Sequence, residues 1–111
     1  MRSILAALLT VTALPASADN IAMCVDTGAS EAVCTCAAAA LAEQVGPEDL
    51  ARYDAISTAF VEKRSEGLGW VDAWDGAVAA VAERDGTAAN TMQRAMNPVG
   101  QAHRDSIKAC E

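Results

Sequence analysis

Aromatic residues are scarce in this chain of 111 residues, which has only Tyr53, Phe60, Trp70 and Trp74. Basic residues are also few: eight Lys and Arg stand against fifteen Asp and Glu, for a formal net charge of −7. Nucleic acids and anionic membranes bind to basic surfaces, so this balance argues against both as partners. We therefore expect an acidic protein that binds no nucleic acid.

The motifs of the common enzyme classes are missing as well. The sequence has a single histidine, His103, and it contains neither a Gly-x-Ser-x-Gly nucleophile motif nor a Cys-x-x-Cys-His haem motif. The chain is also too short for a catalytic domain with a second, substrate-binding domain. We expect a non-enzymatic protein without a resident cofactor.

The longest apolar run, residues 4–14, is too short to cross a membrane, which takes about 20 residues. Arg2 precedes this run, and the small-x-small tripeptide 16–18 follows it. This order is typical of a cleaved secretory signal peptide. We expect residues 1–18 to be removed, and residues 19–111 to form one periplasmic or secreted domain without a membrane span.

Residues 21–24 offer an alternative to simple cleavage, because they resemble a lipoprotein processing box that ends at Cys24. Met23, however, is larger than the small residue that such a box requires. Lipidation of Cys24 would also leave three cysteines, an odd number for an oxidising compartment. Cleavage after residue 18 is therefore the preferred interpretation.

No stretch of the remaining chain shows the alternation of a β-strand, whereas apolar residues recur at steps of three and four. Ser30 is a good N-cap, and Gly46 followed by Pro47 marks the end of one helix and the start of the next. Helices are predicted over residues 19–27, 30–45, 47–64, 70–85 and 87–110. The fold class is therefore an all-α bundle of four to five helices.

Two residues inside these helices have a structural cost. Gly76 lowers helix stability by about 1 kcal/mol relative to Ala, and close approach of a neighbouring helix would explain its presence. Pro98 interrupts the last helix, whose apolar stripe nevertheless keeps its phase on both sides. Either a kink or a break at Pro98 is consistent with the pattern.

Four cysteines in a short exported chain predict two disulfides. Cys34 and Cys36 are two residues apart in a helix, so their side chains point about 200° apart and each needs a different partner. The partners are then Cys24 and Cys110. If the first helix folds back antiparallel, Cys24 lies nearer to Cys34, which favours the pairs Cys24–Cys34 and Cys36–Cys110. The swapped pairing remains open.

Trp70 and Trp74 are spaced by one helical turn and therefore share a face. Since aromatic bulk is scarce, we expect both side chains to fill the core. If one of them is exposed, it would instead anchor a partner surface. The same face leaves open whether the protein is a monomer or a homodimer.

Met92, Met96 and His103 also share a helical face, and thioethers together with an imidazole suit copper. A core seam explains the same stripe. Cys34-Thr35-Cys36 would be an unusual thiol–disulfide redox motif, because it lies inside a helix and lacks the Cys-x-x-Cys spacing. The leading hypothesis is an exported binding module for an unknown protein or small ligand, with a periplasmic copper-binding protein and a thiol–disulfide redox protein as alternatives.

Overall fold

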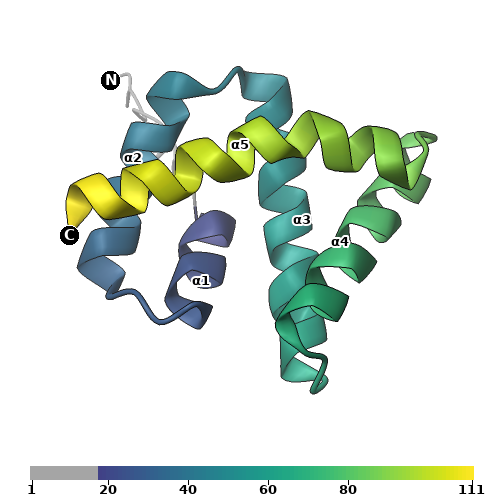
Figure 1. Ribbon diagram of the computed structural model, residues 1–111, viewed down its shortest axis with the longest axis horizontal. Coiled ribbons are helices and arrows are strands. Elements are labelled where there is room, and N and C mark those ends of the chain that lie inside the picture. The colour runs from purple at the N-terminus through teal and green to yellow at the C-terminus, as the bar shows by residue number, and fades with distance from the viewer. Residues whose placement is uncertain (1–17) are drawn as a thin grey trace, which may run out of the picture.

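The computed structural model describes residues 18–111, in which every regular element is a helix. The five helices (Figure 1) confirm the predicted all-α class. Their bounds are α1 Ala18–Asp26, α2 Glu31–Gln44, α3 Pro47–Ser65, α4 Trp70–Asp85 and α5 Ala89–Cys110. Apart from Ala18, at which α1 begins, the predicted signal peptide lies outside the described residues.

The predicted start and stop signals account for most of these bounds. The Ser30 hydroxyl caps α2 by accepting a hydrogen bond from the Val33 amide at 3.2 Å. Gly46 precedes Pro47 at the start of α3, and Gly86 ends α4 with a φ of 69°. The start of α5 is different from the prediction, because Ala88 occupies the N-cap and makes no side-chain hydrogen bond.

α5 runs through Pro98 without a break. Its buried residues keep one phase along the whole helix, and these are Met92, Met96, Val99, His103 and Ser106. Burial of this apolar stripe thus stabilises α5 more than Pro98 destabilises it, since one proline removes a single backbone hydrogen bond.

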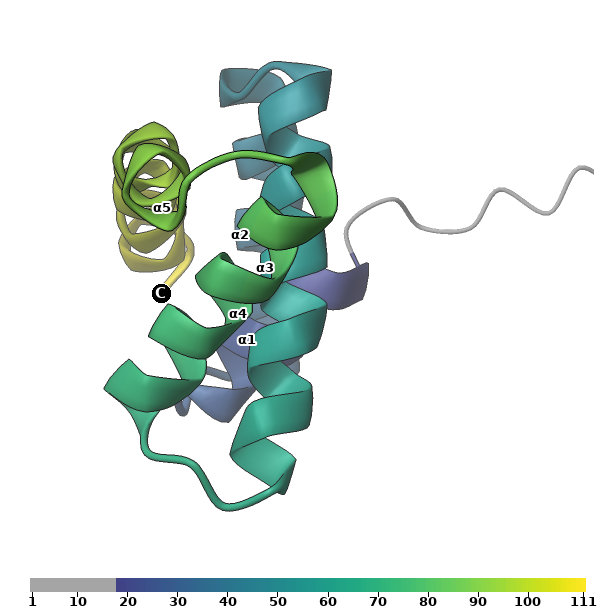
Figure 2. The ribbon, with the colours of Figure 1, turned by 90° about the vertical axis from the view of Figure 1, so that its right-hand side faces the viewer.

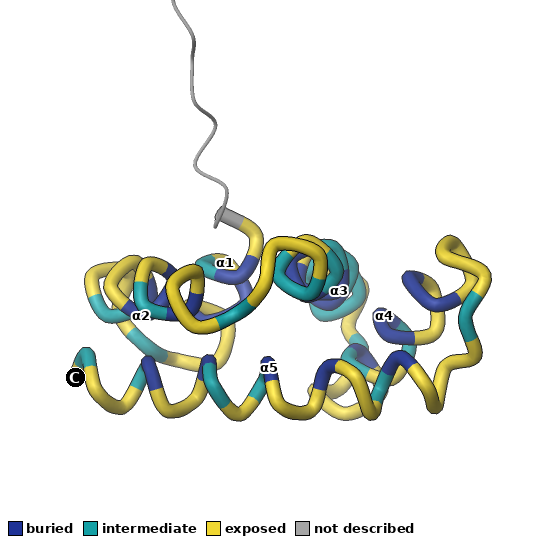
Figure 3. Tube along the Cα trace, turned by 90° about the horizontal axis from the view of Figure 1, so that it is seen from above, coloured by how far each residue is buried: buried dark blue, intermediate teal, exposed yellow. Residues whose placement is uncertain are grey.

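The helices form two layers. α5 lies across one side of the molecule, and α2, α1, α3 and α4 follow one another along its length (Figures 1 and 3). Figure 2 shows α5 end-on, displaced to one side of the other helices. α5 packs against α2, α3 and α4, while α1 packs against α2 and α3. The middle of α5 therefore passes over α1 without close helix-to-helix packing.

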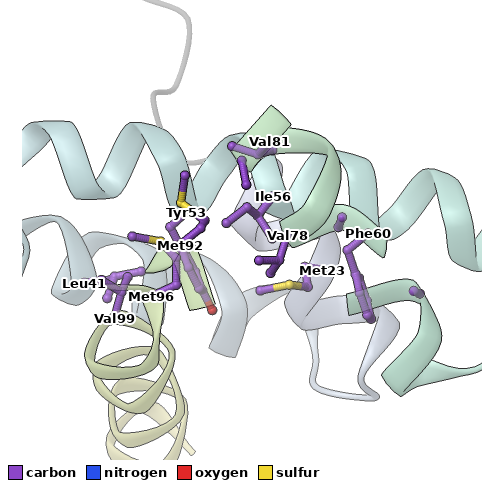
Figure 4. Packing of buried hydrophobic residues seen from close by; sticks show 13 residues of the cluster. Met23, Leu41, Tyr53, Ile56, Phe60, Val78, Val81, Met92, Met96 and Val99 are labelled. Atoms are coloured by element: carbon purple, nitrogen blue, oxygen red, sulfur yellow. The ribbon is translucent and has the colours of Figure 1, made fainter. Parts of the chain in front are cut away.

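The hydrophobic core lies between α3, α4 and the N-terminal half of α5 (Figure 4). Ile56 and Phe60 of α3 are fully buried in it, together with Met96 of α5, and Met23 of α1 joins the same cluster. α4 contributes mainly alanine and valine, so helix backbones approach closely there. The few large side chains consequently provide most of the apolar volume.

Polar contacts join α1 to α3 at two places. The Asn20 amide donates to a carboxylate oxygen of Asp54 at 2.8 Å, and both residues are buried. Burial raises the pKa of Asp54, and the hydrogen bond from Asn20 partly offsets this effect. Nearer the surface, Arg64 Nε lies 2.9 Å from Asp26 Oδ2. These pairs set the position of α1, which is too short to be stable by itself.

Gly76 inside α4 and Gly86 at its C-terminal cap should respond in opposite ways to substitution by alanine. A Cβ at Gly76 would meet the flexible end of Lys63 of α3, at 3.0 Å from Cδ, so the close neighbour is a movable side chain. We expect Gly76→Ala to stabilise the protein by about 0.5–1 kcal/mol. Gly86→Ala should destabilise it by about 1–2 kcal/mol, because the φ of 69° is unfavourable for alanine. Urea unfolding of both variants tests the signs, and equal effects would contradict this account.

Candidate functional site

The disulfides connect Cys24 with Cys34 and Cys36 with Cys110. This is the pairing that the antiparallel arrangement of α1 and α2 favours. The first bridge is buried, since Cys24 is 1% and Cys34 0% exposed. The second lies at the surface, with Cys36 exposed and Cys110 half-buried, and it fastens the C-terminal end of α5 to α2. Two disulfides fit a protein of an oxidising compartment.

A cavity of about 640 Å³ lies where α5 passes over α1, α3 and the start of α4. Its volume is within the range of small-molecule sites, which is about 300–1,000 Å³. Most of the lining comes from α5, and the remainder from the three helices opposite. The lining residues are Met23, Cys24, Thr27, Tyr53, Trp70, Trp74, Gln93, Met96, Asn97, Gly100, Gln101, His103, Arg104, Asp105, Ile107 and Lys108.

The two tryptophans both line this cavity, but they differ in exposure. Trp74 is half-buried against the core, and its indole Nε1 donates to Oε1 of Gln93 at 3.1 Å. Trp70 is 45% exposed, with its ring edge-on to Phe60 at a centroid distance of 5.2 Å. The expectation that both tryptophans fill the core is therefore wrong for Trp70. The core beneath it is already occupied by Phe60.

Tyr53 and His103 form a buried polar pair in the wall of the cavity. The Tyr53 hydroxyl lies 2.6 Å from His103 Nδ1, and the two rings are perpendicular. Burial raises the pKa of the Tyr53 hydroxyl, so this group remains a donor. If it donates to Nδ1, His103 carries its proton on Nε2, and this assignment leaves the fewest buried groups unpaired. Nε2 is itself buried and has no hydrogen-bond partner among the described residues.

Burial, reinforced by the positive charge of Arg104, lowers the pKa of His103 to about 4. The unfolded chain binds a proton on this histidine near pH 6.5, whereas the folded protein does so only near pH 4. The contribution of His103 to stability is therefore complete above pH 6.5 and is lost as the pH falls toward 4. The expected loss is about 3 kcal/mol.

Urea unfolding at several pH values, compared between the wild type and His103→Gln, isolates this contribution. Asp54 changes stability in the opposite direction, because its pKa is raised and its protonation favours the folded state. Its effect is common to both proteins and cancels in the comparison. We expect the stability advantage of the wild type to shrink by about 3 kcal/mol between pH 7 and pH 4. A constant advantage would show that His103 titrates normally in the folded protein.

The proposed copper residues are divided between two places. Met96 and His103 line the main cavity, and Met23 of α1 lines it with them. Met92 lines a different pocket beside Arg52 and Asp85, because it lies about 16 Å from His103 along the axis of α5. Among residues 18–111, no three His, Cys, Asp or Glu side chains form a group that would hold a metal ion.

Basic residues outnumber acidic ones in the lining of the cavity, whereas acidic residues outnumber basic ones in the whole chain. Arg104 and Lys108, one turn apart on α5, line the cavity together with Asp105, the single acidic residue of the lining. Gln101 connects two of them, since it donates to Asp105 Oδ1 at 2.9 Å and accepts from Arg104 Nη2 at 3.0 Å. One side of the cavity is thus weakly basic in a protein that is otherwise strongly acidic.

Gly100 leaves open space in the α5 side of the cavity. A Cβ at this position would have a single neighbour within 4 Å, Arg104 Nη1 at 3.7 Å. A glycine in a helix interior lowers stability relative to alanine. The vacant volume next to Gly100 therefore offers a way to fill the cavity by substitution without disturbing the core.

Several of these features were missed by reasoning from the sequence. His103 was placed on one helical face with Met92 and Met96, but nothing in the sequence indicates that this face meets Tyr53. The roles of Gln93 and Gly100 depend in the same way on the crossing of α5 over α4 and α1. The sequence contains one local signal, the spacing of Arg104 and Lys108, which are four residues apart and therefore share a helical face.

None of the helices in the described part of the chain is long and apolar enough to cross a membrane. Comparisons with protein-family models, with curated proteins and with solved structures found no match to this chain.

Proposed function

We propose that this protein is an exported, non-enzymatic binding module that holds a small, largely apolar molecule in the cavity beneath α5. The observation that carries this proposal is the cavity itself, about 640 Å³ in volume and lined by both tryptophans. The chain has only four aromatic residues, and three of them line this one cavity.

The chemistry of the lining supports a ligand with an apolar body. Met23 and Met96 add flexible thioether side chains, which adapt to ligands of different shape. Gln93 and Asn97 provide a few polar groups, and a small number of such groups is typical of binding sites that orient their ligand. The disulfide at Cys110 limits how far the C-terminal half of α5 can move away from the cavity.

Occupation of the cavity is tested with N-phenyl-1-naphthylamine, a neutral apolar dye that becomes fluorescent when it leaves water. We expect the oxidised protein to bind the dye and its tryptophan emission to change as the dye binds, because both indoles line the cavity. Gly100→Leu should weaken binding by about tenfold or more, because the leucine occupies the ligand volume. Gly100→Ala is the matched control, since its single methyl group leaves most of the volume open.

The same variants separate loss of binding from loss of folding. Both substitutions replace a helical glycine, so their thermal midpoints should equal or exceed that of the wild type. The proposal fails if the dye does not bind, or if Gly100→Leu binds it as well as the wild type does. It also fails if the protein sediments as a dimer that Gly100→Leu converts to a monomer, since a second copy would then cover the cavity.

Copper binding is the second candidate function. Met23, Met96 and His103 line the same cavity, and thioethers together with an imidazole suit copper. Nε2 of His103 would be the ligand in the tautomer that carries the proton on Nδ1, with Nδ1–H donating to the Tyr53 hydroxyl. Titration with Cu(I) against a competing chelator is the test. Met96→Leu should weaken binding, while Met92→Leu, which lies outside the cavity, should leave it unchanged.

A further inference from the structure

The cavity combines an apolar interior with a basic margin, and this combination specifies the class of ligand. We propose that the ligand is a monocarboxylate amphiphile, with an apolar chain or ring beside Trp70 and Trp74 and a carboxylate bound by Arg104 and Lys108. This inference rests on the proposed function. It adds the charge and the headgroup of the ligand.

The two basic side chains of the cavity lining differ from most other arginines of the chain in their ion pairing. Among residues 18–111, the ion pairs of Arg52, Arg64 and Arg84 use the carboxylates of Asp26, Asp49 and Asp85. The other four basic residues of this range, Lys63, Arg94, Arg104 and Lys108, form no ion pair with any described residue, and of these four only Arg104 and Lys108 line the cavity. Two unpaired cations beside one cavity leave their charge for a ligand.

The second step is the number of charges. Arg104 and Lys108 supply two positive charges, and Asp105 supplies one negative charge to the same lining. The balance of one positive charge matches a singly charged anion better than a doubly charged one. The planar guanidinium of arginine also matches the two oxygens of a carboxylate. These two properties favour a carboxylate over a phosphate monoester.

The third step concerns the wall next to these cations. His103 immediately precedes Arg104 and has a buried ring nitrogen without a partner, a donor in the tautomer assigned above. Nε2 has almost no accessible surface, so the donors that a ligand would meet here are those of Arg104 and Lys108. Trp70 and Trp74 line the same cavity from α4, and an apolar chain would lie against their indole rings. The lining is thus polarised in the way an amphiphile requires.

Competition against N-phenyl-1-naphthylamine tests the headgroup with four probes that share a ten-carbon chain: decanoate, 1-decanol, decyl phosphate and decyltrimethylammonium. Each is used below its micelle concentration with the oxidised protein at pH 7.5. We expect decanoate to displace the dye at about five- to tenfold lower concentration than 1-decanol, the size expected for solvent-accessible ion pairs. Raising the salt concentration should reduce this preference.

Variants of the basic pair assign the preference to its residues. Arg104→Gln combined with Lys108→Gln should remove the advantage of decanoate and leave the affinity for 1-decanol unchanged. Arg94→Gln is the control, because Arg94 is an exposed cation of the same helix outside the cavity lining. It should leave the advantage of decanoate in place.

The outcomes distinguish this inference from the proposed function. If decanoate and 1-decanol compete equally, or if decyltrimethylammonium competes best, the anionic headgroup is wrong while the apolar cavity stands. A stronger effect of decyl phosphate than of decanoate would overturn the assignment to a carboxylate. If the dye itself does not bind, the proposed function fails and this inference fails with it.

Discussion

Reduction of both disulfides is expected to unfold most of this protein at 37 °C. The bridges close loops with sequence separations of 10 and 74 residues. Loop-closure entropy assigns them about 2.7 and 4.5 kcal/mol, a total of about 7 kcal/mol. A domain of this size has a total stability of about 5–15 kcal/mol. Circular dichroism at 222 nm, recorded with and without a strong reductant, should show a large loss of helix.

Alkylation and mass spectrometry show whether each bridge was opened in this experiment. Cys36 is exposed, whereas Cys24 and Cys34 are buried, so labels should appear first on Cys36 and Cys110. The variant Cys36→Ala/Cys110→Ala should retain the short-loop bridge and lose about 4.5 kcal/mol. A fully alkylated protein with an unchanged thermal midpoint would contradict the dependence on disulfides.

The substitution Phe60→Ala should have the largest effect of any single change in the core, with a loss of about 3–5 kcal/mol. Phe60 is fully buried at the contact of α3 with the start of α4, where Trp70 covers it edge-on. The surrounding residues are helical and closely packed, so they cannot collapse fully into the space left by the ring. Urea unfolding followed by circular dichroism measures the loss.

Trp70→Ala is the matched control for this prediction. Trp70 touches the same ring from the solvent side and is 45% exposed, so its removal should lower stability by only about 1 kcal/mol. A larger loss of stability for Phe60→Ala than for Trp70→Ala would show that the buried ring contributes more to this aromatic contact than the exposed one. Equal losses would mean that Trp70 is as much a part of the core as Phe60.

The fold class could be predicted because helices are encoded locally. Ser30 caps α2 and Gly46-Pro47 starts α3 as predicted, and Gly86 ends α4 through an equally local effect on the backbone. Pro98 shows the limit of such reasoning. Its local preference for a break is weaker than the packing of the buried stripe on both sides, and α5 therefore continues.

The disulfide pairing could be predicted from the sequence for a similar reason. Cys34 and Cys36 point in different directions from one helix, and the short connection at Gly28 makes α1 antiparallel to α2. These two local facts favour Cys24–Cys34 and Cys36–Cys110 over the swapped pairs. Neither fact indicates that the first bridge is buried and the second is at the surface.

By itself, the sequence determined the helices, most of their ends and the favoured partner of each cysteine, because these follow from interactions between residues close in the chain or from the geometry of one helix. The tertiary structure alone decided that Tyr53 meets His103, that Trp70 remains half outside the core, and that Arg104 and Lys108 lie beside the same cavity as both tryptophans. These features depend on where α5 crosses the other helices. That crossing results from side-chain packing summed over four helices, and no local segment of the sequence contains it.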